Sequence, residues 1–270
     1  MGKAEAESIH RPLPLAGGMG WGIWQRGVHT LRMVSADFPR DTFLLMLPEC
    51  LFEKSGYFFW CAELSASAAW QAHGANEAIR TAATPGAAEY QTRLTCHPGM
   101  LTLSLSIRNL SQERWRQAGG VVCLRLWEAP TFADGELVRT YMRSAGDFVS
   151  LADTDRSYGN PNFNAYLRSG VGPLAAWAEP TALWTPRREV PDDGFVATVA
   201  RDGSGVVAMF WEPFHDIGCN ASEQFRCIHS NPMVGDLEPG ETATCRGCIC
   251  VLKGSGIEEA YQLCRTATGG

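Results

Sequence analysis

Two histidines are the residues in this sequence best suited to proton-transfer chemistry. His215 and His229 both fall in the polar stretch 211–247, which begins where the apolar run 206–211 ends. A neutral imidazole near pH 7 can take or give a proton without first being driven to an unusual ionisation state. The segment Ser230-Asn231-Pro232 follows His229 and restrains the backbone beyond it. We therefore expect His229 to act as a general acid/base from a loop held by a rigid β scaffold.

The neighbours of these histidines supply candidates for the other roles. His215 or Glu212 is expected to be the partner of His229, and Asn220 and Arg246 are expected to hold substrate oxygens. This reading requires the two imidazoles to converge on one cavity. The alternative is that both histidines are hydrogen-bonded loop residues that only hold turns in place.

The sequence contains nine tryptophans, whose indole faces can stack on the apolar faces of sugars. Trp177 and Trp184 lie in loop stretches and are the expected sugar platforms, and Trp115 is a further candidate for lining a cleft. The tryptophans within apolar runs are expected in the core instead: Trp60, Trp127 and Trp211.

Ten cysteines raise the question of disulfides and metals. Most lie inside apolar runs, where a free cysteine behaves as a small buried hydrophobe, so we expect a reducing, cytoplasmic location and few disulfides. Alternation along a strand would turn Cys245 away from Cys248 and Cys250, which prevents them from sharing one ion. A metal site with mixed histidine and cysteine ligands is conceivable from four residues that are close in sequence, but their spacing matches no standard metal motif: His215, Cys219, Cys227 and His229. We therefore predict no metal and no cofactor.

Charge and missing motifs exclude several classes of function. The net charge is −6 and no basic cluster occurs, which argues against nucleic-acid binding and against a polybasic membrane surface. No apolar stretch is long enough to span a bilayer as a helix, and the amino end lacks the apolar core of a signal peptide. The nucleophile elbow, the P-loop and the dinucleotide fingerprint are also missing from the sequence. A small molecule or an oligosaccharide is the expected ligand.

Sequence patterns predict that short β-strands position these residues. Residues 101–108 alternate strictly between apolar and polar, which indicates a strand with one wet face. Further strands are predicted at 43–47, 57–64, 121–127 and 242–252, with strand and loop over 68–90. Residues 195–200 and 206–211 flank an Asp-Gly turn and predict a hairpin. Ser255 is expected to cap a short helix over 257–264.

These elements predict an all-β fold, an antiparallel β-sandwich with long loops and a short C-terminal helix. Residues 1–30 are expected to be an irregular lead-in, and residues 31–270 a single domain. Residues 140–190 are rich in turn formers and are predicted to form long loops over the sandwich, where function is common.

Three stretches resemble the galactose-mutarotase-type β-supersandwich of carbohydrate-active proteins. They are the strand ending at Asn109-Leu110-Ser111, the segment VVCLRLWEAPTFAD at 121–134, and CIHSNPMVGDLEPGETATCRGCICVLKG at 227–254, which holds an L-x-P-G-E turn at 237–241. The resemblance implies a supersandwich and a histidine acid working with a glutamate base. His229 or His215 matches the histidine, and no glutamate is matched by motif.

We therefore expect a carbohydrate-active protein that moves a proton on a sugar, by epimerisation or by β-elimination. One alternative is a non-catalytic carbohydrate-binding or scaffold module, which would bind through Trp177 or Trp184. A second alternative is a metal-dependent hydrolase or lyase.

Overall fold

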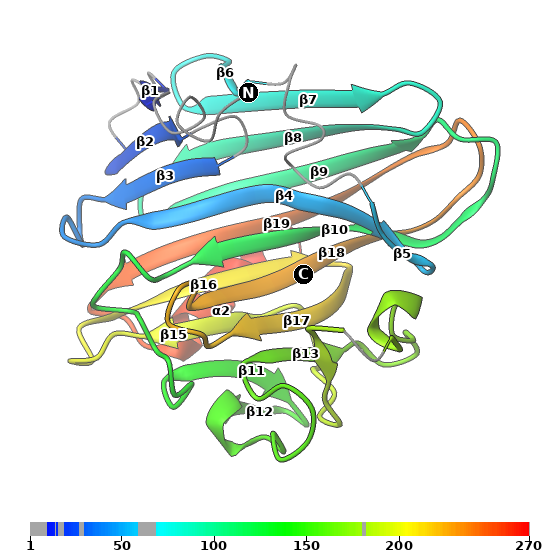
Figure 1. The fold of residues 1–270 in the computed structure, drawn as a ribbon. Coiled ribbons are helices and arrows are strands. Elements are labelled where there is room, and N and C mark those ends of the chain that lie inside the picture. Colours follow the sequence, from blue (N-terminus) through cyan, green and yellow to red (C-terminus); the bar gives the residue numbers. More distant parts are fainter. Residues whose placement is uncertain are drawn as a thin grey trace.

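Two β-sheets packed face to face form the body of the protein in a computed structural model (Figure 1). The structure describes residues 10–13, 15, 19–26, 30–58, 69–179 and 182–269. The predicted antiparallel β-sandwich is confirmed. Among the described helices, none is long and apolar enough to cross a membrane.

The first sheet has ten strands, and its centre is formed by strands from distant parts of the chain. Strand β13 pairs with β14 in parallel, while the other described pairings are antiparallel. Strand β5 pairs with β4 beside the main path. The order along that path is β1 (His10–Pro12), β2 (Trp21–Arg26), β3 (Thr30–Ser35), β4 (Phe43–Glu53), β10 (Trp115–Arg125), β18 (Cys227–Leu237), β17 (Phe214–Asn220), β13 (Phe163–Leu167) and β14 (Thr185–Pro186), with β5 at Gly56–Phe58.

The second sheet has nine strands and lies behind the first in Figure 1. Its order is β12 (Asp147–Ser150), β11 (Thr140–Ser144), β15 (Val196–Val199), β16 (Gly205–Glu212), β19 (Thr242–Lys253), β9 (Met100–Asn109), β8 (Ala88–His97), β7 (Glu77–Thr84) and β6 (Gln71–Ala72). The predicted hairpin corresponds to β15 and β16, and Gly203 in its turn has a φ of 73°, which glycine adopts without steric cost.

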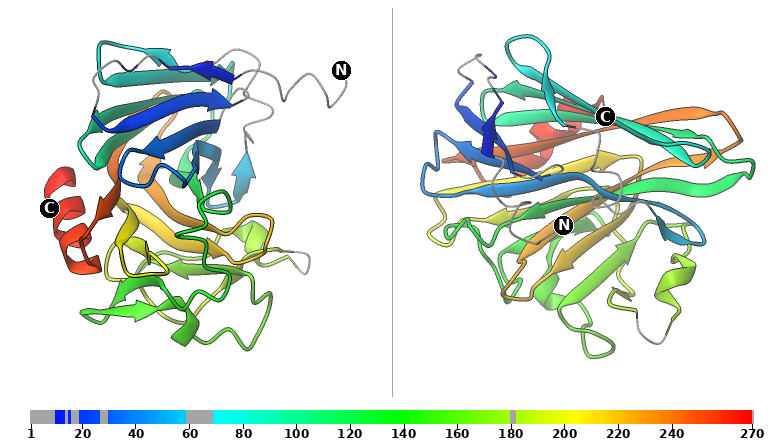
Figure 2. Two further views of the ribbon diagram at one scale, coloured as in Figure 1. Left: turned by 90° about the vertical axis from the view of Figure 1, so that its left-hand side faces the viewer. Right: turned by 45° about the horizontal axis from the view of Figure 1, so that its top comes forward.

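The main core fills the space between the sheets because alternate residues of each strand point inward. On β9, Leu101, Leu103, Leu105 and Ile107 are buried, while the hydroxyl residues between them are partly exposed. The alternation seen in the sequence therefore gives the correct inward face. Strand β16 is buried on both faces, since helix α2 (Ile257–Thr268) covers the outer side of the second sheet (Figure 2).

The helix differs in detail from the prediction. Gly256, and not Ser255, is the N-cap residue, and Glu259 accepts a hydrogen bond from its backbone. The helix ends at Thr268, because Gly269 adopts a left-handed φ of 87° that closes the last turn.

Several expectations need correction. Residues 10–12 and 21–26 form strands, so the amino-terminal part is not uniformly irregular. Trp127 is 43% exposed, because β10 ends at Arg125 before reaching it, whereas Trp115 is buried in β10. Trp211 is buried as expected, and Trp60 lies outside the described residues, as does most of the strand predicted at 57–64. The nine described cysteines are free and buried.

The segment 140–190 is more structured than predicted. It contains short strands and two 3-10 turns, η1 (Leu151–Asp153) and η2 (Ala175–Trp177). Leu174 and Trp177 pack against Phe52 and Val121 on the outer face of the first sheet. The part of the segment around η2 therefore covers that face, while α2 covers the other sheet.

Replacing an inward leucine of β9 tests the core. Leu105→Ala should lower the free energy of unfolding by about 2–5 kcal/mol, because a fully buried leucine leaves a cavity. The neighbouring Ser104→Ala, on the outer face, should change it by less than about 0.5 kcal/mol. Urea unfolding of both variants measures the difference, and equal effects would contradict the assigned faces.

Candidate active site

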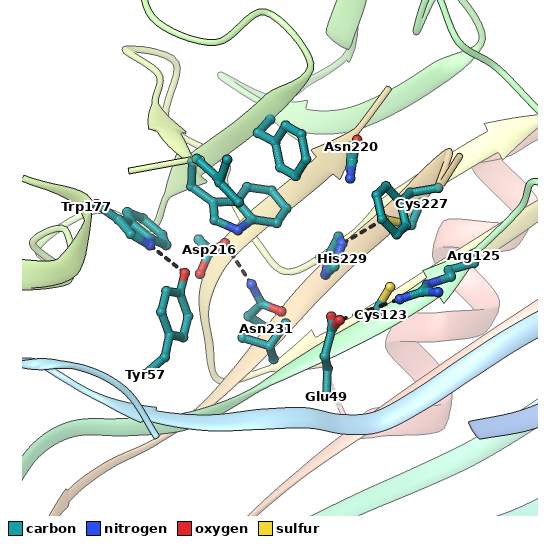
Figure 3. Close-up of a pocket in the computed structure, with 15 residues that line it drawn as sticks. Glu49, Tyr57, Cys123, Arg125, Trp177, Asp216, Asn220, Cys227, His229 and Asn231 are labelled. Atoms are coloured by element: carbon teal, nitrogen blue, oxygen red, sulfur yellow. Dashed lines mark hydrogen bonds and ion pairs between the residues drawn. The ribbon is translucent and has the colours of Figure 1, made fainter. Parts of the chain in front are cut away.

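A cavity of about 220 Å³ opens on the outer face of the first sheet, beneath the segment that covers it (Figure 3). Outward side chains of β10, β17 and β18 form its floor, β4 and β5 supply one wall, and residues from 163 to 184 supply another. Its lining residues are Glu49, Tyr57, Val121, Cys123, Arg125, Phe163, Trp177, Leu183, Trp184, Asp216, Asn220, Phe225, Cys227, His229 and Asn231.

Strand register brings together residues of the floor that are far apart in sequence. Cys123 of β10 lies directly opposite His229 of β18, and Arg125 lies opposite Cys227. Cys227, His229 and Asn231 share one face because they are two residues apart along β18. Their inward neighbours point into the core, so these polar side chains must face the cavity.

An irregularity in β4 brings a carboxylate to the cavity. Between Val121 and Cys123, β10 advances two residues while β4 advances four, from Cys50 to Met46. Glu49 lies in this bulged stretch, and its side chain lines the cavity. Its carboxylate lies 3.7 Å from the guanidinium of Arg125, an ion pair that holds the carboxylate at the floor.

A β-bulge on β17 carries His215. Phe214 pairs with Pro232 and Asp216 with Asn231, so His215 is the extra residue. Its Nδ1 lies 2.8 Å from Oδ1 of Asp216, and Oδ2 of Asp216 accepts a hydrogen bond of 2.8 Å from Asn231. The Asn231 side chain in turn accepts a hydrogen bond of 3.1 Å from a backbone N–H of β10. This buried chain of bonds ties three strands together.

The two histidines do not meet as the sequence suggested. His229 lines the cavity, but His215 is fully buried, with its ring 4.9 Å from Phe52 and 5.9 Å from Trp177. Nor are they loop residues: each is in a strand, because the polar stretch alternates with inward apolar residues. Asp216 connects them indirectly, since it bonds to His215 and also lines the cavity.

Opposing influences act on the pKa of the His229 imidazole. Burial lowers the pKa of this imidazole, but the opposing influence of Cys123, Glu49 and Asp216 is greater and raises the pKa above its usual value. Its Nε2 lies 3.0 Å from the sulfur of Cys227. Nδ1 is buried and has no hydrogen-bond partner among the described residues.

Cys123 completes a compact group with Cys227 and His229. One ligand atom from each of the three lies within 4.8 Å of the others. The pKa of the Cys123 thiol is raised well above its usual value by burial first, and then by its hydrogen bond with Cys227. This group was not predicted, because the strand pairing that places Cys123 beside His229 leaves no signature in sequence spacing. The predicted separation of Cys245 from Cys248 and Cys250 is confirmed, since Cys245 faces the core and the other two face α2.

Aromatic residues form the cavity walls. The Trp184 ring meets His229 edge-on at 5.1 Å, and Trp177 donates a hydrogen bond to the Tyr57 hydroxyl. Gly218 lies opposite His229, and a Cβ there would be only 3.2 Å from the Trp184 ring. The missing side chain at this position makes room for the indole.

The structure separates the predicted site residues into two groups. Trp177, Trp184, Asn220 and His229 line the cavity. Glu212 and Arg246 do not: they are register partners on β16 and β19, in the second sheet. They are close to the histidines in sequence only because the chain passes from one sheet to the other at Pro213. The roles predicted for these two side chains beside His229 are therefore corrected.

Comparison with known proteins identifies the fold. No protein-family model and no curated protein matches the sequence. A galactose mutarotase-like protein from Lactobacillus casei matches with a TM-score of 0.51 and 8% identity, over 90% of this chain and all of that one (100%). An alpha-mannosidase from Enterococcus faecalis matches with a TM-score of 0.55 and 12% identity, over 95% of this chain and 31% of that one. The Slr1438 protein from Synechocystis matches with a TM-score of 0.50 and 9% identity, over 87% of this chain and 92% of that one. The chain thus has the galactose mutarotase-like sandwich fold that its sequence resembles.

The bonds of Asp216 give a test of the buried network. Asp216→Asn places an amide donor against either His215 or Asn231, so one buried donor loses its acceptor. The free energy of unfolding should therefore fall by about 1–3 kcal/mol. Asp202→Asn, in an exposed turn, keeps the side-chain oxygen that accepts from Ser204 and should be nearly neutral. Urea unfolding compares the two, and equal stabilities would contradict the network.

Proposed function

We propose that this chain binds a sugar in the cavity on the first sheet and transfers a proton on it, as an epimerase. The observation that carries the proposal is the presence of an imidazole and a carboxylate, His229 and Glu49, on one cavity lined by two indoles. The fold shared with a galactose mutarotase-like protein supports the same class of substrate. Glu49 takes the role that sequence spacing suggested for Glu212 or His215.

The walls and floor suit the two kinds of surface that a sugar presents. The apolar face of the ring would stack on Trp184, with Trp177 closing the far side. Hydroxyl groups would bond to polar side chains that line the cavity, of which Asn220 and Arg125 are candidates. The Arg125 guanidinium is held over the Phe225 ring at 5.0 Å, so it is positioned before a ligand arrives.

A reaction at the anomeric carbon fits these groups. Glu49 would take the proton of the anomeric hydroxyl while His229 gives a proton to the ring oxygen, and the bond between that oxygen and the anomeric carbon breaks. The product is an open-chain aldehyde. Rotation about the adjacent carbon–carbon bond, followed by the reverse transfers, closes the ring with the opposite configuration. No group is consumed, because on ring closure Glu49 gives its proton to the carbonyl oxygen and His229 takes a proton back from the attacking hydroxyl.

Removal of either proton-transfer group tests the reaction. His229→Gln and Glu49→Gln should each slow the interconversion of the anomers by at least about 100-fold, the usual contribution of a general acid or base. The measurement follows the optical rotation of freshly dissolved α-glucose or α-galactose. His73→Gln, at an exposed histidine paired with Glu77, is the matched control and should keep full activity. A wild-type rate equal to that of buffer for all aldoses would refute the proposal.

Binding can be tested apart from catalysis. Trp184→Ala should raise the Kd of the sugar by up to about 10-fold, since an aromatic contact contributes about 0.5–1.5 kcal/mol beyond buried area. Trp127→Ala removes an exposed indole that is not part of the cavity lining and should leave the Kd unchanged. Calorimetric titration with the same aldoses measures both, and a similar loss in both variants would contradict stacking on Trp184.

A further inference from the structure

The floor of the cavity brings two thiols and an imidazole into one small group. Cys123 lies across the strand pair from His229, and Cys227 precedes His229 by two residues on the same face. One ligand atom of each lies within 4.8 Å of the others, and Nε2 of His229 is 3.0 Å from Sγ of Cys227. In a tetrahedral zinc site, bond lengths of about 2.3 Å to sulfur and about 2.0 Å to nitrogen bring the ligand atoms to within about 4 Å of one another. The observed group needs only small side-chain rotations to reach that geometry.

The chemistry of the donors selects the kind of ion. Thiolate and imidazole bind zinc and other thiophilic metals, whereas calcium and magnesium require oxygen ligands. Two thiolates would neutralise the charge of a divalent ion, which matters because Cys123, Cys227 and His229 are all buried. Nearby Glu49 and Arg125 already neutralise each other as an ion pair.

An ion held by Cys123, Cys227 and His229 would lie at the floor of the cavity. All three residues come from β10 and β18, which lie side by side in the interior of the first sheet, so the backbone ladder holds them in place without a metal. All three also line the cavity (Figure 3). Three protein ligands leave a fourth position of a tetrahedral ion for water or a ligand atom, as in catalytic zinc sites.

We propose that Cys123, Cys227 and His229 bind one thiophilic divalent cation, preferably Zn²⁺, with its fourth coordination position open to the cavity. The site does not depend on the proposed epimerase activity. It does have a consequence for that activity, because an imidazole that coordinates a cation through Nε2 cannot be doubly protonated, and the acid in the proposed reaction is the protonated imidazole. The zinc-bound chain is therefore expected to be inactive in the proposed reaction.

Cobalt and zinc titrations test the site on the full chain after treatment with a chelator. One equivalent of Co²⁺ should produce a thiolate-to-cobalt charge-transfer band with the intense visible bands of tetrahedral cobalt, and Zn²⁺ should bleach them. Cys123→Ser and Cys227→Ser should each weaken zinc binding by more than about 100-fold, beyond the usual effect of losing a residue that only supports a ligand. Cys245→Ser, at a buried cysteine of the second sheet, should leave zinc binding unchanged.

The wild-type chain provides a measurement that does not depend on the folding of variants. X-ray absorption at the zinc edge should detect two sulfur ligands and one imidazole, and a shell of only nitrogen and oxygen would overturn the site. Absence of the charge-transfer band, or unchanged affinity in folded Cys227→Ser, would overturn it as well.

Zinc dependence of the reaction separates the two proposals. Loss of the anomer interconversion on adding Zn²⁺, with recovery on chelation, supports both. A cobalt spectrum without any reaction on aldoses supports the metal site and refutes the epimerase. A reaction that zinc accelerates would support metal binding and overturn the inhibitory consequence and the acid role of His229.

Discussion

The packing of two sheets on one apolar layer is the constraint on which the rest of this structure depends. Once Val122 and Leu124 of β10 and Ile228 of β18 point into that layer, the residues between them must point outward. The outward set is Cys123, Arg125, Cys227 and His229, which together form the cavity floor. The polar floor therefore follows from the burial of its apolar neighbours, and the buried strands fix the side to which each of its side chains points.

Irregular strand pairing places side chains at the cavity that regular alternation along the strands would not bring there. The extra residues in β4 bring Glu49 to the cavity, and the bulge at His215 lets consecutive residues of β17 face the same side. Asp216 consequently reaches both His215 and Asn231, with bonds of 2.8 Å to each. Such irregularities are common beside functional sites because they redirect a side chain without disturbing the sheet as a whole.

Sequence patterns predicted the frame better than the site, for a physical reason. The alternation at 101–108 and the Asp-Gly turn at 202–203 are local signals, so β9 and the hairpin of β15 and β16 follow from them. Four cavity residues, Trp177, Trp184, Asn220 and His229, were also selected from their local context. The contributions of Glu49 and Cys123 were not, because they depend on strand register and on a bulge, which join segments far apart in the chain. Proximity in sequence was misleading for Glu212 and Arg246, whose strands belong to the other sheet.

The two outer faces of the sandwich are covered in different ways. A regular helix rests on one, and the described loop residues between β13 and β14, which carry Trp177 and Trp184, rest on the other. Much of that loop lies outside the layer between the sheets, so many replacements in it would alter the shape above the floor at little cost to folding. The shape of the cavity can therefore change through this cover, while the strands below keep the same floor.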